Sequence, residues 1–298
     1  MPFALRSRRS RGPGFTLVEL LVVLAIIGIL IGIMIPAIQK VREMMARTQC
    51  TNNLKQIGLA LHSYIERDKA FPAGYVSGVD AQGNDTGPGW GWASQILPML
   101  EQQNLFTQIQ FKTPIEAPAN SAARLTVLAG YRCPSDRTTQ TTWTARKYDP
   151  AGAPIADVCD LAVANYVGVF GVGEPGVDGD GLFFRNSAVR LKEITDGTSN
   201  TLAVGERASS LAHATWVGAV TGTEHFPENS SNFVLGHTGE MLNPATPSEG
   251  NNFSSDHPGG VNYLYADGHV QFLTASMSAA TFQALSTRAG GERVSGDN

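Results

Sequence analysis

A histidine and an aspartate near the C-terminus have the residue types and the spacing that best suit chemistry. Nine residues separate His257 from Asp267, and Gly268 follows directly. An imidazole that is oriented by a carboxylate can act as an acid–base catalyst or bind a metal. The sequence contains no G-x-S-x-G, H-E-x-x-H or Cys-His nucleophile motif to accompany this pair. We therefore predict that the chain is not an enzyme, and that these three residues are structural, with Asp267-Gly268 forming a tight hairpin turn.

Two oxygen-rich turns form a second candidate site, this time for a cation. One turn contains Asp178 and Asp180, and the other contains Asp196 and Asn200. Carboxylate and amide oxygens are Ca²⁺ ligands, but neither turn has the spacing of an EF-hand loop. Asp, Asn and Gly also form turns for conformational reasons alone. We assign no cofactor or metal, and Ca²⁺ at these turns stays an alternative.

The N-terminal segment determines the class of protein. A basic leader with four arginines and no acid precedes an apolar run of 21 residues, Phe15 to Ile35, whose one charged residue is Glu19. A helix of that length spans the hydrocarbon core of a bilayer. A cleavable secretory signal has a shorter apolar region, and here the helical pattern continues past it. An ordinary membrane anchor and a prepilin-type segment remain as interpretations.

Glu19 distinguishes these two interpretations. A carboxylate inside an apolar membrane helix costs about 2.5–3.5 kcal/mol, and an ordinary anchor has no use for one. Cleavage between Gly14 and Phe15 would create an α-amino group one helical turn from Glu19. When such helices bundle, the amine of one subunit can meet the carboxylate of its neighbour. The position of this acid therefore favours the prepilin interpretation.

The residues Gly14-Phe15-Thr16-Leu17-Val18-Glu19, behind a basic leader, resemble the processing site of type IV pilins and type II secretion pseudopilins. The resemblance implies a prepilin peptidase that cuts after Gly14 and N-methylates Phe15, which makes Glu19 the fifth mature residue. Pro36 matches the helix-kinking proline of these proteins. The chain is thus expected to be a pilin-like or pseudopilin-like structural subunit that is held in the membrane and then assembled or displayed at the surface.

The resemblance also implies location and partners. Gly28 and Gly32 form a GxxxG face that suits close packing against other pilin-like subunits. The arginines keep the leader in the cytoplasm, so the precursor crosses the inner membrane once with its C-terminal domain outside the cytoplasm. After assembly the domain is periplasmic or on the cell surface. The formal net charge of −4 indicates no basic surface that would bind nucleic acid.

The patterning predicts an α+β, pilin-like fold. Apolar residues recur at threes and fours from Val41 to Ile65, so the apolar helix continues as an amphipathic half that packs on an antiparallel β-sheet domain. The expected divisions are a cleaved basic leader at 1–14, an apolar transmembrane helix at 15–38, its amphipathic half at 39–70, a globular β-rich domain at 71–290 and a disordered tail at 291–298.

Shorter elements are expected throughout the globular part. Helices are predicted at 92–109, broken at Pro98, at 121–128, capped by Asn120, and at 278–287. Strands are predicted at 161–170, 181–185, 189–193, 201–206, 215–220, 261–265 and 269–273. Antiparallel pairing alone suits such short connections.

The whole chain resembles a large prepilin-like family of unknown function, once catalogued as solute-binding, that carries His, nine residues and Asp-Gly near its C-terminus. The matching motifs are the segments at 50–60, 91–98, 133–136, 165–168, 196–201, 205–206, 257–260 and 267–268. Residues 221–250 match nothing in the family and are interpreted as a variable loop. Because the role of the family is unknown, a helix-anchored module that binds a ligand outside the cytoplasm stays an alternative function.

Three cysteines allow three different single disulfides, and a location outside the inner membrane permits one. The family resemblance implies a bond between Cys50 and Cys133, which would leave Cys159 free. A bond between Cys133 and Cys159, which closes a shorter loop, is the second choice.

Overall fold

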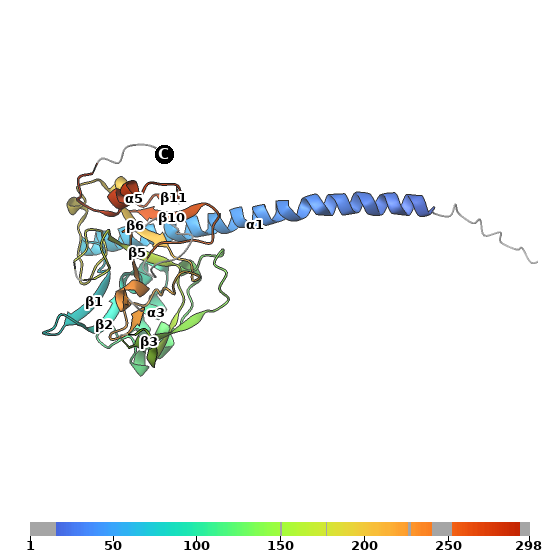
Figure 1. Cartoon of the computed structure of the whole chain (residues 1–298). Coiled ribbons are helices and arrows are strands. Elements are labelled where there is room, and N and C mark those ends of the chain that lie inside the picture. Colours follow the sequence, from blue (N-terminus) through green and yellow to red (C-terminus); the bar gives the residue numbers. More distant parts are fainter. Residues whose placement is uncertain (1–15, 150, 177, 226–227, 240–251, 293–298) are drawn as a thin grey trace, which may run out of the picture. The chain divides into compact units, whose positions relative to one another are not determined.

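Helix α1 (Leu17–Asp68) is the longest element of the chain. The structure is a computed structural model that describes residues 16–149, 151–176, 178–225, 228–239 and 252–292 (Figure 1). The chain divides into two units, residues 1–45 and residues 46–298. The predicted cleavage site, Gly14 and Phe15, lies outside the described residues.

The N-terminal unit contains the apolar part of α1. This helix is long and apolar enough to cross a membrane. Gly28 and Gly32 are one turn apart and therefore lie on one face. Pro36 lies inside the helix, and its ring removes one backbone N–H from the hydrogen-bond ladder.

The second unit contains the rest of α1, and there one face of the helix is buried. The periodicity predicted a packed face from Val41 onwards, but no residue of α1 from Leu17 to Thr48 is buried. Burial begins two residues later and repeats at threes and fours, as expected for a helix that packs on a core. The buried residues are Cys50, Asn53, Leu54, Ile57, Gly58, Ala60, Leu61 and Ile65.

A five-stranded sheet lies against this helix, with the strand order β11-β10-β6-β5-β9. The strands are β5 (Tyr166–Gly171), β6 (Leu202–Glu206), β9 (Leu235–His237), β10 (Gly260–Tyr265) and β11 (Val270–Thr274). Three neighbouring pairs are antiparallel, but β5 and β9 are parallel. The expectation of antiparallel pairing is confirmed for the predicted strands of this sheet. Strand β9 was not predicted, and the long chain between β5 and β9 allows their parallel pairing.

The two faces of the sheet carry different cores. Leu264 of β10 faces α1, where a Cβ on Gly58 would come within 2.8 Å of its Cδ1 atom. Tyr263 points to the other face and packs on Phe282 of helix α5 (Ala279–Ser286), with 5.7 Å between ring centroids. The sheet is therefore covered by α1 on one side and by α5 on the other.

Three two-stranded hairpins complete the β-structure. They are β1 (Tyr75–Val79) with β2 (Asp85–Gly91), β3 (Thr142–Tyr148) with β4 (Pro154–Ala162), and β7 (Glu224–His225) with β8 (Glu228–Asn229). The single strand predicted at 161–170 is wrong, because the chain leaves one hairpin at Ala162 and enters the main sheet at Tyr166. The β7–β8 hairpin and β9 lie within the segment interpreted as a variable loop.

The helix predicted at 92–109 consists of three short pieces: α2 (Trp92–Gln95), the 3₁₀ helix η1 (Leu97–Leu100) and α3 (Gln103–Gln108). Besides the break near Pro98, Glu101 has φ 60° and ends η1. The helix predicted at 121–128 is shorter, α4 (Ser121–Arg124). Asn120 does not cap it through its side chain, because its Oδ1 atom accepts the Gln110 N–H at 2.9 Å.

Three predicted strands are irregular instead. Residues 181–185 and 215–220 contribute only isolated bridges, from Arg185 to Tyr75 and from Gly218 to Trp90. Residues 189–193 include the 3₁₀ helix η4 (Leu191–Glu193). The remaining 3₁₀ helices are η2 (Pro118–Asn120), η3 (Ala129–Tyr131), η5 (Thr198–Asn200) and η6 (Ser230–Phe233). The predictions of β6, of the β10–β11 hairpin and of α5 are confirmed to within one or two residues.

Candidate functional site: a buried disulfide with a histidine and a glutamate

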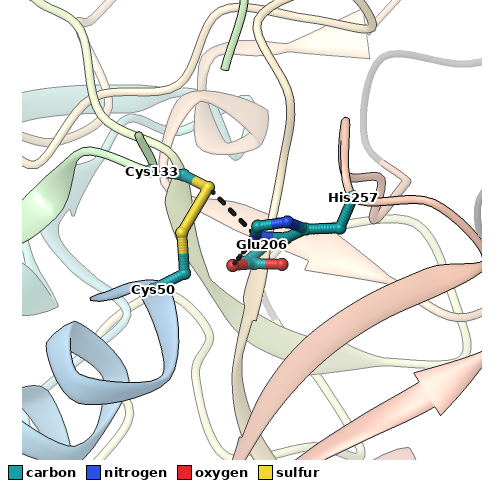
Figure 2. Close-up of side chains that lie close together, drawn as sticks. All are labelled: Cys50, Cys133, Glu206 and His257. Atoms are coloured by element: carbon teal, nitrogen blue, oxygen red, sulfur yellow. Dashed lines mark hydrogen bonds and ion pairs between the residues drawn. A yellow bond between two sulfur atoms is a disulfide. The ribbon is translucent and has the colours of Figure 1, made fainter. Parts of the chain in front are cut away.

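A disulfide links α1 to the turn that follows η3. Cys50 and Cys133 form this bond, with 5.4 Å between their Cα atoms and a sequence separation of 83 (Figure 2). This is the pairing that the family resemblance implies. Cys159 on β4 is a free, buried thiol, and burial raises its pKa to about 11. Cys159 therefore stays protonated and unreactive at neutral pH.

An imidazole and a carboxylate lie against the disulfide (Figure 2). The His257 Nε2 atom is 3.4 Å from the Cys133 Sγ atom and 3.6 Å from Glu206 Oε1. The side chains of His257 and Glu206 are 0% and 1% exposed. Potential ligand atoms of Cys50, Cys133, Glu206 and His257 all lie within 4.8 Å of one another, the one such cluster found among the described residues. We call these four residues the buried cluster.

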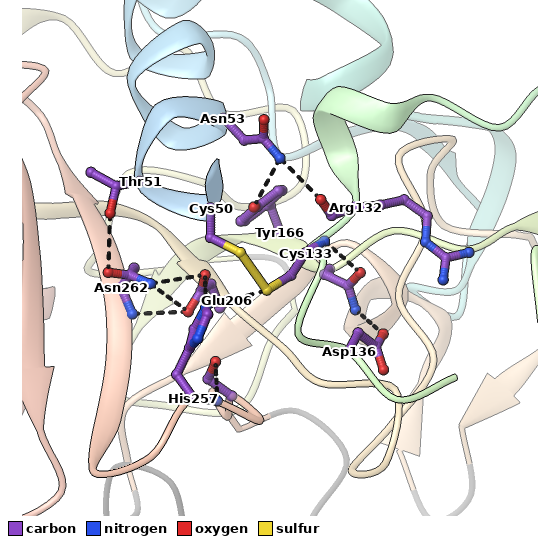
Figure 3. Close-up of polar contacts among 12 residues, drawn as sticks. Cys50, Thr51, Asn53, Arg132, Cys133, Asp136, Tyr166, Glu206, His257 and Asn262 are labelled. Atoms are coloured by element: carbon purple, nitrogen blue, oxygen red, sulfur yellow. Dashed lines mark hydrogen bonds and ion pairs between the residues drawn. A yellow bond between two sulfur atoms is a disulfide. The ribbon is translucent and has the colours of Figure 1, made fainter. Parts of the chain in front are cut away.

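Asn262 holds the carboxylate of the buried cluster in place (Figure 3). Its backbone N–H donates to Glu206 Oε2 at 3.0 Å, and its Nδ2 atom donates to Oε1 at 3.1 Å. The Thr51 hydroxyl donates in turn to Asn262 Oδ1 at 3.5 Å. The Glu206 carboxylate, at the end of β6, is thus oriented by β10, and β10 is contacted by α1.

A second set of hydrogen bonds fixes the turn that carries Cys133 (Figure 3). The Cys133 N–H donates to Asn165 Oδ1 at 3.0 Å, and Asn165 Nδ2 donates to the Asp136 carboxylate. On the helix side, Asn53 Nδ2 donates to the Arg132 carbonyl at 3.0 Å and to the Tyr166 hydroxyl at 3.3 Å. Buried polar groups need such partners, so this network specifies one position for the turn on α1.

The buried cluster unites motifs that lie far apart in the sequence. The segments at 50–60, 133–136, 165–168, 205–206 and 257–260, which carry the family resemblance, all contribute to it or to the network around it. Sequence reasoning did not single out Glu206 or Asn262. The available signal was an acidic residue at the end of a fully buried strand, which needs a partner.

His257 and Asp267 do not form the pair that the sequence offered as a possible site. They lie at opposite ends of β10, about 20 Å apart for a six-residue strand. Asp267 instead accepts the His269 N–H at 3.0 Å and contacts the His269 Nδ1 atom at 2.6 Å. Gly268, with φ 93°, forms the tight turn between β10 and β11. This turn packs near α1, where the His62 ring would be 3.4 Å from a Cβ on Gly268.

The charge of Asp267 supports this turn. Burial alone would raise the pKa of Asp267, but hydrogen bonds from His269 and Ser199 outweigh burial and lower it. Because the pKa is lower in the folded chain, the carboxylate stabilises the fold above its unfolded pKa. That contribution is lost as the pH falls through the folded pKa.

We expect Asp267→Asn and His257→Gln to act independently on the free energy of unfolding. Asp267→Asn should cost at most about 1 kcal/mol, since Asn-Gly forms the same turn. His257→Gln, which keeps hydrogen-bonding capacity, should cost at most about 2 kcal/mol. Chemical unfolding of both single variants and of the double variant measures the coupling, which should stay below about 0.5 kcal/mol. A larger coupling would show that the two residues act as a unit after all.

The two oxygen-rich turns do not gather into a cation site among the described residues. Asp180 Oδ1 accepts the Val172 N–H at 3.0 Å, and Asp196 accepts the N–H groups of Gly290 and Gly291 at 2.7 and 2.9 Å. Asn200 donates to the Asp196 carbonyl at 3.0 Å. These side chains hold the backbone of neighbouring segments. Asp178 likewise belongs to no group of three metal-ligating side chains in the described chain.

Glu19 has a local partner at the start of α1. Its carboxylate accepts from the Thr16 N–H and from the Thr16 hydroxyl, each at 2.8 Å, and the Glu19 N–H donates to the Thr16 hydroxyl at 3.3 Å. This reciprocal arrangement is a capping box, which the pattern Thr-x-x-Glu signals in a sequence. Within a single chain, the Glu19 carboxylate therefore accepts a hydrogen bond from a backbone N–H group that would otherwise lack a partner at the start of α1.

An apolar helix long enough to cross a membrane, continued into an α+β domain whose sheet it covers, defines a type IV pilin-like, membrane-anchored precursor. The prokaryotic N-terminal methylation motif matches residues 9–35, which agrees with that class. The chain belongs to the family described as protein of unknown function (DUF1559), which matches residues 39–279. No curated protein and no solved structure matches the chain.

Proposed function

We propose that the chain is a pilin-like or pseudopilin-like structural subunit. A prepilin peptidase cuts it between Gly14 and Phe15 and N-methylates Phe15, and the mature subunit assembles with other pilin-like subunits through α1. One observation carries this proposal: a single helix, Leu17–Asp68, contains both the apolar segment and the buried face of the globular unit. The same helix thus belongs both to the segment proposed for assembly and to the domain that it carries.

Residues of the apolar segment support assembly through helix packing. Gly28 and Gly32 remove side chains from one face, which allows a neighbouring helix to approach closely. Glu19 carries a charge that an anchor does not need, and an N-terminal amine on an adjacent subunit would compensate it. The capping box accounts for a polar side chain at Glu19 but not for its charge, and that charge and the open glycine face both gain a use when helices of several subunits meet.

The orientation in the membrane follows from charge and from the disulfide. The four arginines of the leader favour the cytoplasmic side. The bond between Cys50 and Cys133 favours an oxidising compartment for the globular unit. We therefore propose that residues 46–298 lie outside the cytoplasm of the precursor, and are periplasmic or surface-displayed after assembly.

The buried cluster supports a structural role over catalysis. A substrate would have to reach His257 or Glu206, whose side chains are 0% and 1% exposed. The cavity that adjoins the cluster has a volume of about 10 Å³, which is the space of a single water molecule. Ligand sites are roughly thirty times larger. In this proposal the cluster fastens the turn at Cys133 to α1.

The mature N-terminus tests the proposal directly. We expect mass spectrometry of the native protein to find an N-terminal peptide that starts at N-methylated Phe15. Gly14→Val should block cleavage, because the resemblance implies a peptidase that cuts after a glycine at this position. Gly12→Val, the same change two residues earlier in the leader, is the matched control and should be cleaved normally.

Finding residues 1–14 still attached in cells with an active prepilin peptidase would contradict the proposal and leave an ordinary anchor. Equal cleavage of the Gly14→Val and Gly12→Val variants would show that a different signal is recognised.

A further inference from the structure

We propose that the buried cluster is a zinc site when its disulfide is reduced. Cys50, Cys133, Glu206 and His257 would then bind one Zn²⁺ ion, and either a disulfide or a metal ion could fasten α1 to the turn at Cys133 (Figure 2). The proposal concerns the globular unit alone and holds whether or not the chain assembles.

The positions of the ligand atoms support a tetrahedral site. Bonds of 2.0–2.3 Å to zinc place neighbouring ligand atoms about 3.3–3.8 Å apart. The His257 Nε2 atom already lies 3.4 Å from Cys133 Sγ and 3.6 Å from Glu206 Oε1. All four ligand atoms lie within 4.8 Å of one another. The two sulfur atoms must move apart, which rotation of the two cysteine side chains allows once the S–S bond is cleaved, and no other pair of ligand atoms needs to approach by more than about 1 Å.

The types of ligand select the metal. Two thiolates and an imidazole favour zinc over Mg²⁺ and Ca²⁺, which prefer oxygen ligands. Four protein ligands complete a tetrahedron, which is typical of structural rather than catalytic zinc sites. All four residues are buried, so water competes little for the fourth position.

Residues around the buried cluster already orient its ligands. Hydrogen bonds from the backbone and side chain of Asn262 reach both oxygens of the Glu206 carboxylate and hold it in place. The bond from the Cys133 N–H to Asn165 fixes the backbone next to one sulfur. Such supporting contacts normally accompany metal ligands and strengthen binding. The adjoining cavity of about 10 Å³ is lined by two of the four ligands, Cys133 and Glu206, among others.

Reduction and reoxidation interconvert the disulfide form of the cluster and its zinc-bound form. A dithiol reductant donates two electrons, its own thiols form a disulfide, and the S–S bond of the chain becomes two thiols. Zn²⁺ then displaces the two thiol protons and is bound by two thiolates, the neutral imidazole and the carboxylate. In the reverse direction a disulfide oxidant takes two electrons from the two thiolates and, with two protons, becomes two thiols, while the S–S bond of the chain is restored and the Zn²⁺ ion is released.

Zinc content of the full chain in detergent micelles tests the proposal. The chain is reduced with a phosphine in the presence of equimolar Zn²⁺, freed of unbound metal, and measured by elemental analysis and circular dichroism. We expect one zinc ion per reduced chain and none per oxidised chain. Substitution with Co²⁺ should give the intense visible bands of a tetrahedral ion and a thiolate-to-metal charge-transfer band.

Variants identify the ligands. His257→Gln and Glu206→Gln should each weaken zinc binding at least tenfold in competition with a chromophoric chelator. Cys159→Ala removes the thiol outside the buried cluster, and His269→Gln removes a histidine outside it; both controls should bind zinc like the wild type. If a variant does not fold, the Co²⁺ spectrum of the reduced wild type provides the test of thiolate ligation in its place.

Three results would overturn the proposal. The first is a reduced, folded wild type that binds no zinc. The second is a reduced wild type that unfolds and is not kept folded by equimolar zinc. The third is zinc binding that is unchanged in His257→Gln or lost in Cys159→Ala.

Discussion

Glu19→Val should abolish or severely reduce incorporation of the subunit into sedimenting assemblies, while membrane insertion and cleavage proceed normally. Replacing the acid by an apolar side chain removes an insertion cost of about 2.5–3.5 kcal/mol, so the precursor should insert at least as well as the wild type. The same change removes the carboxylate that would meet the N-terminal amine of a neighbouring subunit. The measurement compares the variant in whole membranes with the variant in sheared, sedimented material.

The capping box at Thr16 requires a second variant, because Glu19→Val also removes a helix cap. Glu19→Gln separates the two roles, since a glutamine side chain can complete a capping box but carries no charge. If charge pairing governs assembly, Glu19→Gln should fail like Glu19→Val. Glu66→Val, the same substitution at an exposed acid near the end of α1, is the matched control and should assemble normally.

Normal assembly of both Glu19 variants would disprove the pairing of amine and carboxylate. Normal assembly of Glu19→Gln together with failure of Glu19→Val would assign Glu19 to the helix cap alone.

Removing the disulfide should have the largest effect on stability. The double variant Cys50→Ala with Cys133→Ala should lose about 2–5 kcal/mol of the free energy of unfolding. The bond closes a loop of 83 residues, for which chain entropy alone predicts about 4.5 kcal/mol. Guanidinium unfolding of the oxidised full chain in detergent measures the loss.

Cys159→Ala is the control for this measurement, because it removes a buried sulfur without removing a cross-link. Its cost should stay near 1 kcal/mol, as for a small truncation in a core. A double variant as stable as Cys159→Ala would show that packing alone holds α1 on the sheet.

Elements with strong local signals were predictable from the sequence. The α1 helix follows from its apolar run and its continued periodicity, and the β10–β11 hairpin follows from Asp267-Gly268. Helix α5 begins where Ser278 accepts the Thr281 N–H, as a capping serine does. In each case a few neighbouring residues determine the conformation.

Elements that depend on distant contacts were not predictable. β2 has the sequence Asp-Thr-Gly-Pro-Gly-Trp-Gly, and its glycines and proline give it a low strand propensity. It forms because β1 pairs with it. β9 is a strand only because β5 offers its free edge. The buried cluster shows the same limit, since Glu206 and His257 meet only when β6 and the segment before β10 are placed together. Each of the two residues can be recognised in the sequence, but the sequence does not predict that they are in contact.

The site of the disulfide on α1 has a mechanical meaning. Cys50 lies five residues beyond the end of the N-terminal unit and is the first buried position of the helix in the globular unit. A pull along the N-terminal part of α1 therefore reaches a covalent cross-link before it reaches the packed residues from Asn53 to Ile65. Tension passes through Cys133 into the turn and the sheet, and the packed helix cannot be drawn out of the domain unless that bond breaks.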